Sequence, residues 1–452
     1  FPTNHYHPER RPYFVDNYGV HCAVGYMMAE SGFHESVEEI RKNQNFEYIK
    51  DINVGNVPEW AEIHGFEIEE LKWIQPGYPP ATFVQALGAG VNGQVNSIVF
   101  QDTEDRMIIS GSFTEVDGSA CLNIAEYSNN TLSCFGSGIE GEIHKVQSQG
   151  ERVYVYGDLR SNGNVYPFAR YDGSNWIFIE NPNRIDFPGR LGAYNEQSQS
   201  FVVTNEKPIG SIRDEIWLFD SLQNSWQLIA DVMGYVRDIE YDGSDWIIGG
   251  AFNTVVIYDS IGGINNISSN GAIMWNQNTN TWTDISNAGH SEVLDIKMLG
   301  NAIYMAGKCS YLNDDSVCLS RFENSVNTPL IFRRNLSDSN QISISDMAYN
   351  GGSTIEIFGD FDLFPLIGTY GSNVASYDLS TNWLEAIAQI DGEVISGEYF
   401  HNSILIGGTF SNSGSVQNLN NLALLSSTIG SINHREQENL LAYPNPFSEY
   451  IQ

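Results

Sequence analysis

The stretch ALGAGVNGQVNSI at residues 86–98 returns without a gap as CFGSGIEGEIHKV at residues 134–146. A second recurring piece is an apolar run that ends in Gly and often Phe, such as IISGSF and LIGGTF. Its marker positions lie 46, 47, 46, 57, 52 and 49 residues apart, at Gly111, Gly157, Thr204, Gly250, Gly307, Gly359 and Gly408. A repeat of this length with β patterning predicts four-stranded blades arranged around an axis.

Seven markers predict a mainly β chain with a seven-bladed β-propeller over residues 81–430. We expect the recurrent glycine, on the second strand of each unit, to let sheet backbones approach closely near the axis. Residues 81–90, ATFVQALGAG, match a fourth strand, so we expect them to complete the last blade and close the ring. The alternative is a six-bladed ring with residues 187–234 inserted, because that unit is the least regular.

Residues 1–78 follow the helical period instead. Apolar side chains form a stripe along residues 20–28, and residues 33–43, 56–65 and 67–77 predict three more short helices. These segments predict a small α-helical N-terminal domain, and PGYPP at the end of the last one predicts a stiff boundary. The segment resembles an N-terminal region found in secreted proteins of Bacteroidota, which carries no known activity.

Four of the five cysteines form two local pairs. Cys121 and Cys134 flank one predicted turn, and Cys309 and Cys318 flank another, whereas Cys22 stands apart. We therefore expect two disulfides and an oxidising compartment. The alternative is that all four are buried thiols.

The charge of the chain excludes one class of partner. With 56 acidic against 22 basic residues, the formal charge is −34, and such a field repels nucleic acid. Apolar runs never reach the length of a membrane-spanning helix.

Long loops between the second and third strands predict a ligand face, because loops on one side of a rigid scaffold are common binding elements. The candidate side chains there are Asp158, Tyr166, Tyr311, Asp314, Asp360 and Tyr370. Aromatics beside carboxylates can stack on sugar rings, and carboxylate oxygens leave calcium open as a cofactor. The alternatives are solvated carboxylates and aromatics that pack between neighbouring loops. No catalytic or metal-binding motif appears, so the sequence nominates no catalytic residue.

The repeat region resembles the β-propellers with GG-x-F strands in secreted bacterial proteins and, more distantly, kelch propellers. It lacks a Gly-His and Trp-Asp pattern, so it does not resemble the WD type. The C-terminal stretch LLAYPNPFSEYIQ resembles the opening of the type A sorting domain of the Bacteroidota type IX secretion system. The residues that carry this resemblance are Tyr443, Pro444, Asn445, Pro446 and Phe447, followed by Ser448.

A full sorting domain runs further, so we expect residues 431–440 to be a linker and residues 441–452 to be a truncated start of that domain. The resemblance implies export through the outer-membrane translocon, with an associated β-barrel shuttle as a second partner. It also implies a secreted or cell-surface location. The alternative is an ordinary Pro-rich tail.

Together these observations predict an exported binding or adhesion module whose ligand is a glycan or a surface protein. The alternative is a polysaccharide-active lyase or glycosidase built on the same scaffold. A third reading makes the propeller a passive scaffold and gives the specific contact to the helical segment.

Overall fold

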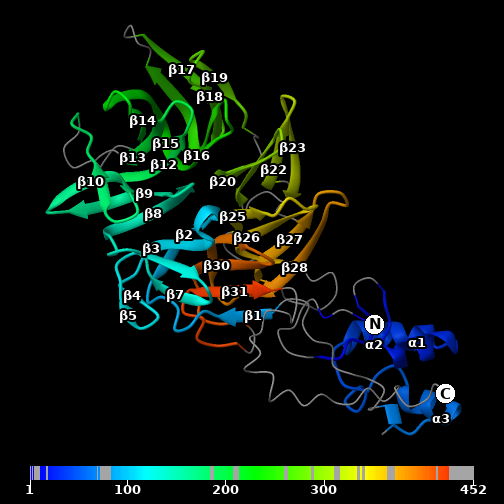
Figure 1. The fold of residues 1–452 in the computed structure, drawn as a ribbon. Coiled ribbons are helices and arrows are strands. Elements are labelled where there is room, and N and C mark those ends of the chain that lie inside the picture. The colour runs from blue at the N-terminus through cyan, green and yellow to red at the C-terminus, as the bar shows by residue number, and fades with distance from the viewer. Residues whose placement is uncertain are drawn as a thin grey trace.

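The computed structural model is mainly β, and its described part has three α-helices near the N-terminus (Figure 1). The structure describes residues 2, 4, 11–16, 19–68, 70–71, 83–183, 188–206, 213–258, 263–286, 290–309, 316–332, 336–337, 342–363, 372–413 and 416–426. The predicted linker at 431–440 and the predicted sorting segment at 441–452 lie outside these residues.

The helical segment has a core of its own. Its helices are α1 (Ala23–Glu30), α2 (His34–Asn43) and α3 (Val57–His64), and they lie together in Figure 1. Buried Phe14, Met28, Ile40 and Trp60 belong to one cluster drawn only from residues 13–71. The fourth predicted helix, at 67–77, lies mostly outside the described residues.

The sheets start with two regular four-stranded units. In the first, the order is β2 (Gln94–Gln101), β3 (Arg106–Ser112), β6 (Ile124–Ser128) and β7 (Thr131–Cys134). In the second, it is β8 (Glu140–Gln149), β9 (Arg152–Ser161), β10 (Asn164–Tyr171) and β11 (Trp176–Ile179). A short 3₁₀ helix, η1 (Asp102–Glu104), leads into β3, and β4 (Glu115–Val116) pairs with β5 (Ser119–Ala120).

One long strand joins the next two units into an eight-stranded sheet. The first part runs through β12 (Gly189–Asn195), β13 (Ser200–Glu206), β14 (Asp214–Asp220) and β15 (Ser225–Tyr241). The second part continues from β15 through β16 (Trp246–Tyr258), β18 (Ala272–Asn276) and β19 (Thr281–Asp284). After residue 252, β16 continues to Tyr258 and pairs with β17 (Ile264–Ser268). That segment is therefore partly a hairpin.

A nine-stranded sheet follows. Its first unit contains β20 (Glu292–Leu299), β21 (Ala302–Cys309), β22 (Val317–Glu323) and β23 (Val326–Phe332). Its second contains β25 (Ile342–Tyr349), β26 (Thr354–Leu363), β27 (Ser372–Asp378) and β28 (Trp383–Gln389). The short strand β24 (Leu336–Ser337) pairs with β26, and β21 pairs with β25 through Lys308 and Cys309.

The last sheet joins the two ends of the repeat region. Its order is β1 (Phe83–Ala86), β31 (Leu422–Ser426), β30 (Ser403–Thr409) and β29 (Glu393–Phe400). Strand β1 pairs antiparallel with β31, from Phe83 opposite Ser426 to Ala86 opposite Ala423, and Figure 1 shows the two side by side. The strand within the segment at 81–90 thus lies on the sheet of the last repeat, and it protects the outer edge of β31.

The marker glycines mark a recurring β-bulge. The first strand of a unit bulges just after the residue that pairs with the glycine, as at Val293 opposite Gly307 and Ile344 opposite Gly359. A Cβ atom on either glycine would collide with the carbonyl oxygen of Glu292 or Ser343. The close backbone approach that the glycine permits therefore joins the first and second strands of the same sheet.

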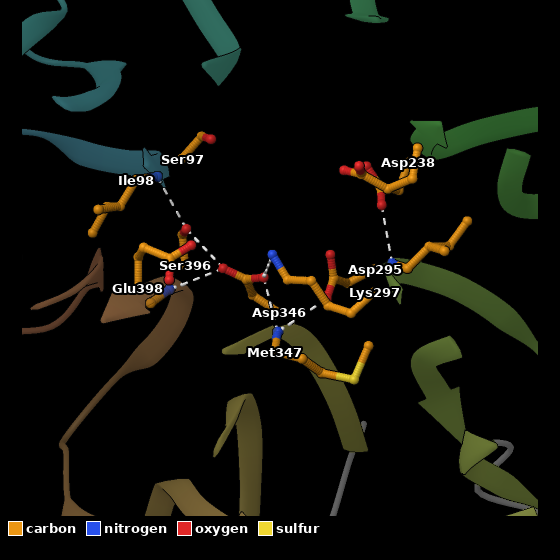
Figure 2. A network of polar contacts seen from close by, with 12 residues as sticks. Ser97, Ile98, Asp238, Asp295, Lys297, Asp346, Met347, Ser396 and Glu398 are labelled. Atoms are coloured by element: carbon orange, nitrogen blue, oxygen red, sulfur yellow. Dashed lines mark hydrogen bonds and ion pairs between the residues drawn. The ribbon is translucent and has the colours of Figure 1, made fainter. Parts of the chain in front are cut away.

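The residue just after each bulge commonly accepts a hydrogen bond from the first strand of a neighbouring unit (Figure 2). These inner-strand bonds run from Ile98 N–H to Ser396 Oγ (3.1 Å), Val146 N–H to Ser97 Oγ (3.2 Å), Ile296 N–H to Asp238 Oδ2 (3.0 Å), Met347 N–H to Asp295 Oδ2 (3.0 Å) and Gly397 N–H to Asp346 Oδ2 (2.9 Å). Each one ties the backbone of one unit to a side chain of its neighbour, which fixes the spacing between units.

A left-handed asparagine makes a second link between units. Asn373, with φ +73°, accepts from Phe361 N–H at 2.8 Å and donates to Ile390 O at 3.0 Å and Gly392 O at 2.8 Å. Asn123 and Asn421 occupy the same place in their units and also have positive φ. Asparagine fits because its short amide tolerates this conformation and offers both a donor and an acceptor.

Both predicted disulfides are present. Cys121 is bonded to Cys134 and Cys309 to Cys318, while Cys22 is a buried free thiol. Disulfides persist in oxidising compartments, so the pairs indicate such an environment. Among the described residues, no helix combines the length and apolarity needed to span a membrane.

Candidate functional site

A cavity of about 770 Å³ opens where the first three units meet, and we call it the hairpin pocket. It is lined by the turns between the first and second strands of these units, including Glu104, Glu151 and Glu196. The turn after β10 adds Asp172 and Gly173. In a meandering four-stranded sheet these turns share one side, so the pocket lies opposite the longer loops that the sequence favoured.

An aromatic wall forms one part of the pocket. Phe135 and Tyr171 both line it, with ring centroids 4.8 Å apart, and the ring centroid of Trp176 lies 5.2 Å from that of Tyr171. Phe135 is buried, whereas Tyr171 is half-buried and keeps part of its ring open to the cavity. Gly136, with φ +57°, leaves room beside the Tyr171 ring, which a Cβ would approach to 3.2 Å. Tyr171 thus presents a partly exposed aromatic ring that packs against Phe135 and Trp176.

Most charged groups of the pocket are held by neighbours. Arg106 lies with its guanidinium 4.9 Å from the Phe135 ring centre and donates to Glu126 Oε2 at 2.8 Å. Asp172 accepts from the backbone N–H groups of Asn175 and Ser174, which lower the pKa of its carboxyl. These bonds fix the turn and leave Asp172 ionised at neutral pH.

Two atoms of the pocket residues are buried without a hydrogen-bond partner among the described residues. They are Arg170 Nε, a donor, and Gln149 Oε1, an acceptor. The amide nitrogen of Gln149 donates to Glu196 Oε2 at 2.9 Å, and only the nitrogen can donate to a carboxylate, so the position of Oε1 is set. Buried polar atoms are normally paired, so these two are exceptions within the described part of the chain.

The described residues of the predicted ligand face lie outside the lining of the hairpin pocket. Asp158 on β9 pairs with Arg160 at 3.0 Å, and Tyr166 on β10 packs on Phe178 with ring centroids 5.0 Å apart. Asp360 is exposed on β26. Tyr311, Asp314 and Tyr370 lie outside the described residues. The structure brings Asp158 and Tyr166 onto adjacent strands of one sheet, and neither lines the hairpin pocket.

The sequence does not single out Arg106, Gln149 or Arg170 as site residues. A usable signal was present, because the first-to-second strand turns of the first three repeats are rich in charged and amide residues, as in QDTEDR and SQGER. Because these turns are short, the ligand face was predicted on the longer loops between the second and third strands instead. Short hairpins from neighbouring units can nevertheless form a concave site together, which one repeat read alone does not reveal.

A second polar cluster lies on the inner strands. Lys145 on β8 donates to Asp238 Oδ1 at 2.6 Å, Ile239 O at 2.8 Å and Glu240 Oε1 at 2.9 Å. Burial alone would lower the pKa of Lys145, but attraction to Asp238 and Glu240 outweighs it and raises that pKa. Lys145 therefore stays charged, and the cluster is held by charge-assisted bonds.

Burial raises the pKa of carboxyl groups on other inner strands, whereas it lowers that of a lysine (Figure 2). It raises the pKa of Asp295 well above its usual value, and the nearby Asp346 carboxylate adds to the rise. Lys297 Nζ lies 3.8 Å from Asp346 Oδ1. Burial alone would lower the pKa of Lys297, but attraction to the Asp295 and Asp346 carboxylates outweighs this effect and raises the pKa, so the lysine keeps its proton. Burial also raises the pKa of Glu398. These bonds and pairs span neighbouring units, which indicates a structural role.

In the part of the chain that the structure describes, no group of three His, Cys, Asp or Glu side chains is arranged to hold a metal ion. The carboxylates of the inner strands bond to lysines and backbone N–H groups instead. Calcium therefore stays a prediction of the loop composition.

Comparison with known proteins supports the architecture. Residues 80–248 match the family described as Rax2 C-terminal beta propeller domain. No curated protein matches the sequence. The match and the succession of four-stranded units together show a β-propeller fold.

Three solved structures are similar over most of the chain. The designed Ika8 protein is 12% identical, with 74% of this chain and 96% of that chain covered and a TM-score of 0.46. A chain of the Mitotic Checkpoint Complex is 11% identical, with 76% and 92% covered and a TM-score of 0.47. The Neurospora crassa Pan2 WD40 domain is 11% identical, with 74% and 89% covered and a TM-score of 0.42.

Proposed function

We propose that this chain is an exported binding module on a seven-bladed β-propeller closed by β1. Three contacts between the first and last repeats support closure. Ser396 accepts from Ile98 N–H, Asn421 Nδ2 donates to Val91 O at 3.2 Å, and Leu405 shares a core cluster with residues of β2 and β3. The first strands also contact one another in succession, β2–β8–β12–β15–β20–β25–β29 and back to β2.

Export is the second part of the proposal. The two disulfides support an oxidising compartment, and the motif at Tyr443–Phe447 is the reason to choose type IX secretion, with its translocon and shuttle as transient partners. Expression of the complete gene in Bacteroidota strains with and without a working type IX translocon tests it. Surface or medium location only in the first strain supports the route, and equal export in both strains contradicts it.

The ligand proposed is a glycan, bound in the hairpin pocket. The observation that carries this is the half-buried ring of Tyr171, which lines the pocket beside Phe135 and among charged and amide side chains. Sugar sites combine an aromatic surface with a few fixed polar groups in the same way. Arg106 and Asp172 are already bonded to other groups, so neither is placed to promote turnover.

The test uses the full chain on immobilised polysaccharides, with calcium and with chelator, reading bound protein and released sugar together. Glu151 lies exposed at the mouth of the pocket, so Glu151→Trp should block binding. Glu62→Trp on exposed α3 is the matched control and should bind normally. Normal binding by Glu151→Trp would move the site to another face, such as the longer loops. Released sugar would establish the enzyme alternative.

A further inference from the structure

We propose that the hairpin pocket selects a cationic amino sugar, whose ammonium group is attracted by Glu104 and Glu151 while its ring lies on Tyr171. This inference rests on the proposed glycan-binding function and adds the chemical class of the ligand.

The first step is the balance of charge in the pocket lining. Three arginines and five carboxylates line the cavity, so two carboxylates are in excess. Each arginine lies close enough to one carboxylate for mutual attraction, in the pairs Arg106 and Glu126, Arg152 and Glu196, and Arg170 and Asp172. The excess therefore belongs to Glu104 and Glu151, which form no ion pair with any described residue.

The second step is the position of these two carboxylates. Glu104 ends η1 in the first unit, and Glu151 lies in the turn after β8 in the second. The turns are tied together, because Thr103 Oγ1 and Gln101 Nε2 both donate to Gly150 O at 2.8 Å. Glu104 directly follows Thr103, Glu151 directly follows Gly150, and both glutamates are exposed. The junction therefore brings two uncompensated negative charges to neighbouring turns of one cavity.

The third step is the kind of ligand that suits this charge. An ammonium group bound near these turns is attracted by both carboxylates, because charges within about 10 Å of each other are only partly screened at moderate salt. A carboxylated sugar is repelled by the same two groups, and a neutral sugar gains nothing from them. The formal charge of −34 on the whole chain acts in the same direction.

The fourth step explains why the positive charge is carried by a sugar. Tyr171 is half-buried in the pocket wall and packs against Phe135 and Trp176, so its ring offers a supported apolar surface. The C–H face of a sugar ring fits such a surface, and a nearby ammonium group is attracted to the aromatic ring as well. A flexible basic chain could reach the carboxylates but would not cover the ring as a rigid sugar does.

The experiment measures binding of the full chain by calorimetry to glucosamine oligomers and to N-acetylglucosamine oligomers of the same length. The two series share one ring and differ in the acetyl group, which removes the charge of the amine. At about pH 6, where amines and carboxylic acids are in general both charged, we expect the glucosamine series to bind about tenfold more tightly. This preference should shrink severalfold in about 0.5 M salt, because salt screens the attraction.

Charge-removing variants locate the preference. The double variant Glu104→Gln and Glu151→Gln should bind both series alike, because glutamine keeps the size of the side chain and removes only its charge. Each single variant should weaken binding of the glucosamine series about threefold. Glu140→Gln is the matched control, since Glu140 is exposed at the other end of β8 and outside the pocket lining, and it should leave the preference intact.

The outcomes separate this inference from the proposed function. Tighter binding of the N-acetylglucosamine series that Glu151→Trp abolishes would overturn the cationic class and keep the glycan-binding pocket. A preference that the double variant retains would overturn the role of the two glutamates. Equal binding of oligolysine at matched charge would overturn the selection of a sugar. Failure of both series, while another polysaccharide binds at the pocket, would overturn this inference alone, and failure of every glycan would overturn both.

Discussion

Lys145 Nζ lies 2.6 Å from Asp238 Oδ1, and this ion pair joins β8 to β15 past the strand between them, β12. On β12 the residue after the bulge is Leu191, whose side chain has no polar group to accept a hydrogen bond from a neighbouring unit. Lys145 thus bridges the one described first strand that lacks a polar residue at this position. The irregular third repeat, which suggested a six-bladed alternative, is spanned by a charged contact.

Replacing Lys145 by Met should destabilise the propeller, because Asp238 and Glu240 would lose the cation that compensates their burial. We expect a loss of about 3 kcal/mol in the free energy of unfolding, read by urea denaturation at pH 7. Lys50→Met is the control, since Lys50 is exposed and lies 3.9 Å from Asp51. Equal stability of the two variants would show that the Lys145 contacts contribute nothing net.

Replacing Asp295 by Asn should remove part of the loss of stability at high pH. The folded-state pKa of Asp295 is raised, so the unfolded chain ionises first, from about pH 4. Between that pH and the folded pKa, the native state binds more protons, and wild-type stability falls by up to about 1.4 kcal/mol per pH unit. The amide of the variant would keep an oxygen for Met347 N–H and would not titrate.

The measurement is urea unfolding of wild type and Asp295→Asn at several pH values from about 4 to 9, the range above the unfolded pKa. The difference in stability, variant minus wild type, should grow as pH rises. The exposed-site variant Asp51→Asn should show no such growth. A difference that stays constant with pH would mean that Asp295 is ionised in the folded protein.

Replacing His290 by Gln should protect the protein against acid. Burial lowers the pKa of His290 to about 4, and its Nε2 lies 2.9 Å from Ser320 Oγ. The unfolded chain therefore takes up a proton first as pH falls below about 6.5, and stability is lost until about pH 4. That loss amounts to roughly 3 kcal/mol and should be absent in the variant, whose amide can still bond to Ser320.

Thermal melts of wild type and His290→Gln at several pH values between about 7.5 and 4 provide the check, because this range spans the two pKa values. The two melting temperatures should converge as pH falls, or cross in favour of the variant. Parallel curves over this range would show that His290 is protonated in the folded state without cost.

Replacing Asn373 by Ala should cost about 3 kcal/mol, because Phe361 N–H, Ile390 O and Gly392 O would lose their partner. Asn373→Gly should cost about 1 kcal/mol less, since glycine accepts the positive φ without strain. Asn129→Ala shares the left-handed backbone in an exposed turn and isolates the backbone cost. A loss at Asn373 no larger than that at Asn129 would contradict the role of the three bonds.

Much of the fold follows from local chemistry in the sequence. The glycine spacing predicts the four-stranded units because a bulge opposite a marker glycine leaves no room for a Cβ, as at Gly307. Cys121 lies just before β6 and Cys134 ends β7, the next strand of the same sheet, so their pairing was readable from spacing. The pairing of β1 with β31 also follows, because a fourth-strand pattern ahead of the first unit must find an open edge.

The hairpin pocket and the inner-strand contacts were decided by tertiary structure. The hairpin pocket forms only where turns of the first three units meet, and Lys145 meets Asp238 from 93 residues away. A repeat sequence specifies strands and turns through contacts within each unit. The side chains that meet between units depend on the twist of each sheet and on how the units pack. For this protein the sequence therefore determined the β units, their edges and the disulfides, whereas the packing of those units decided which polar groups became partners.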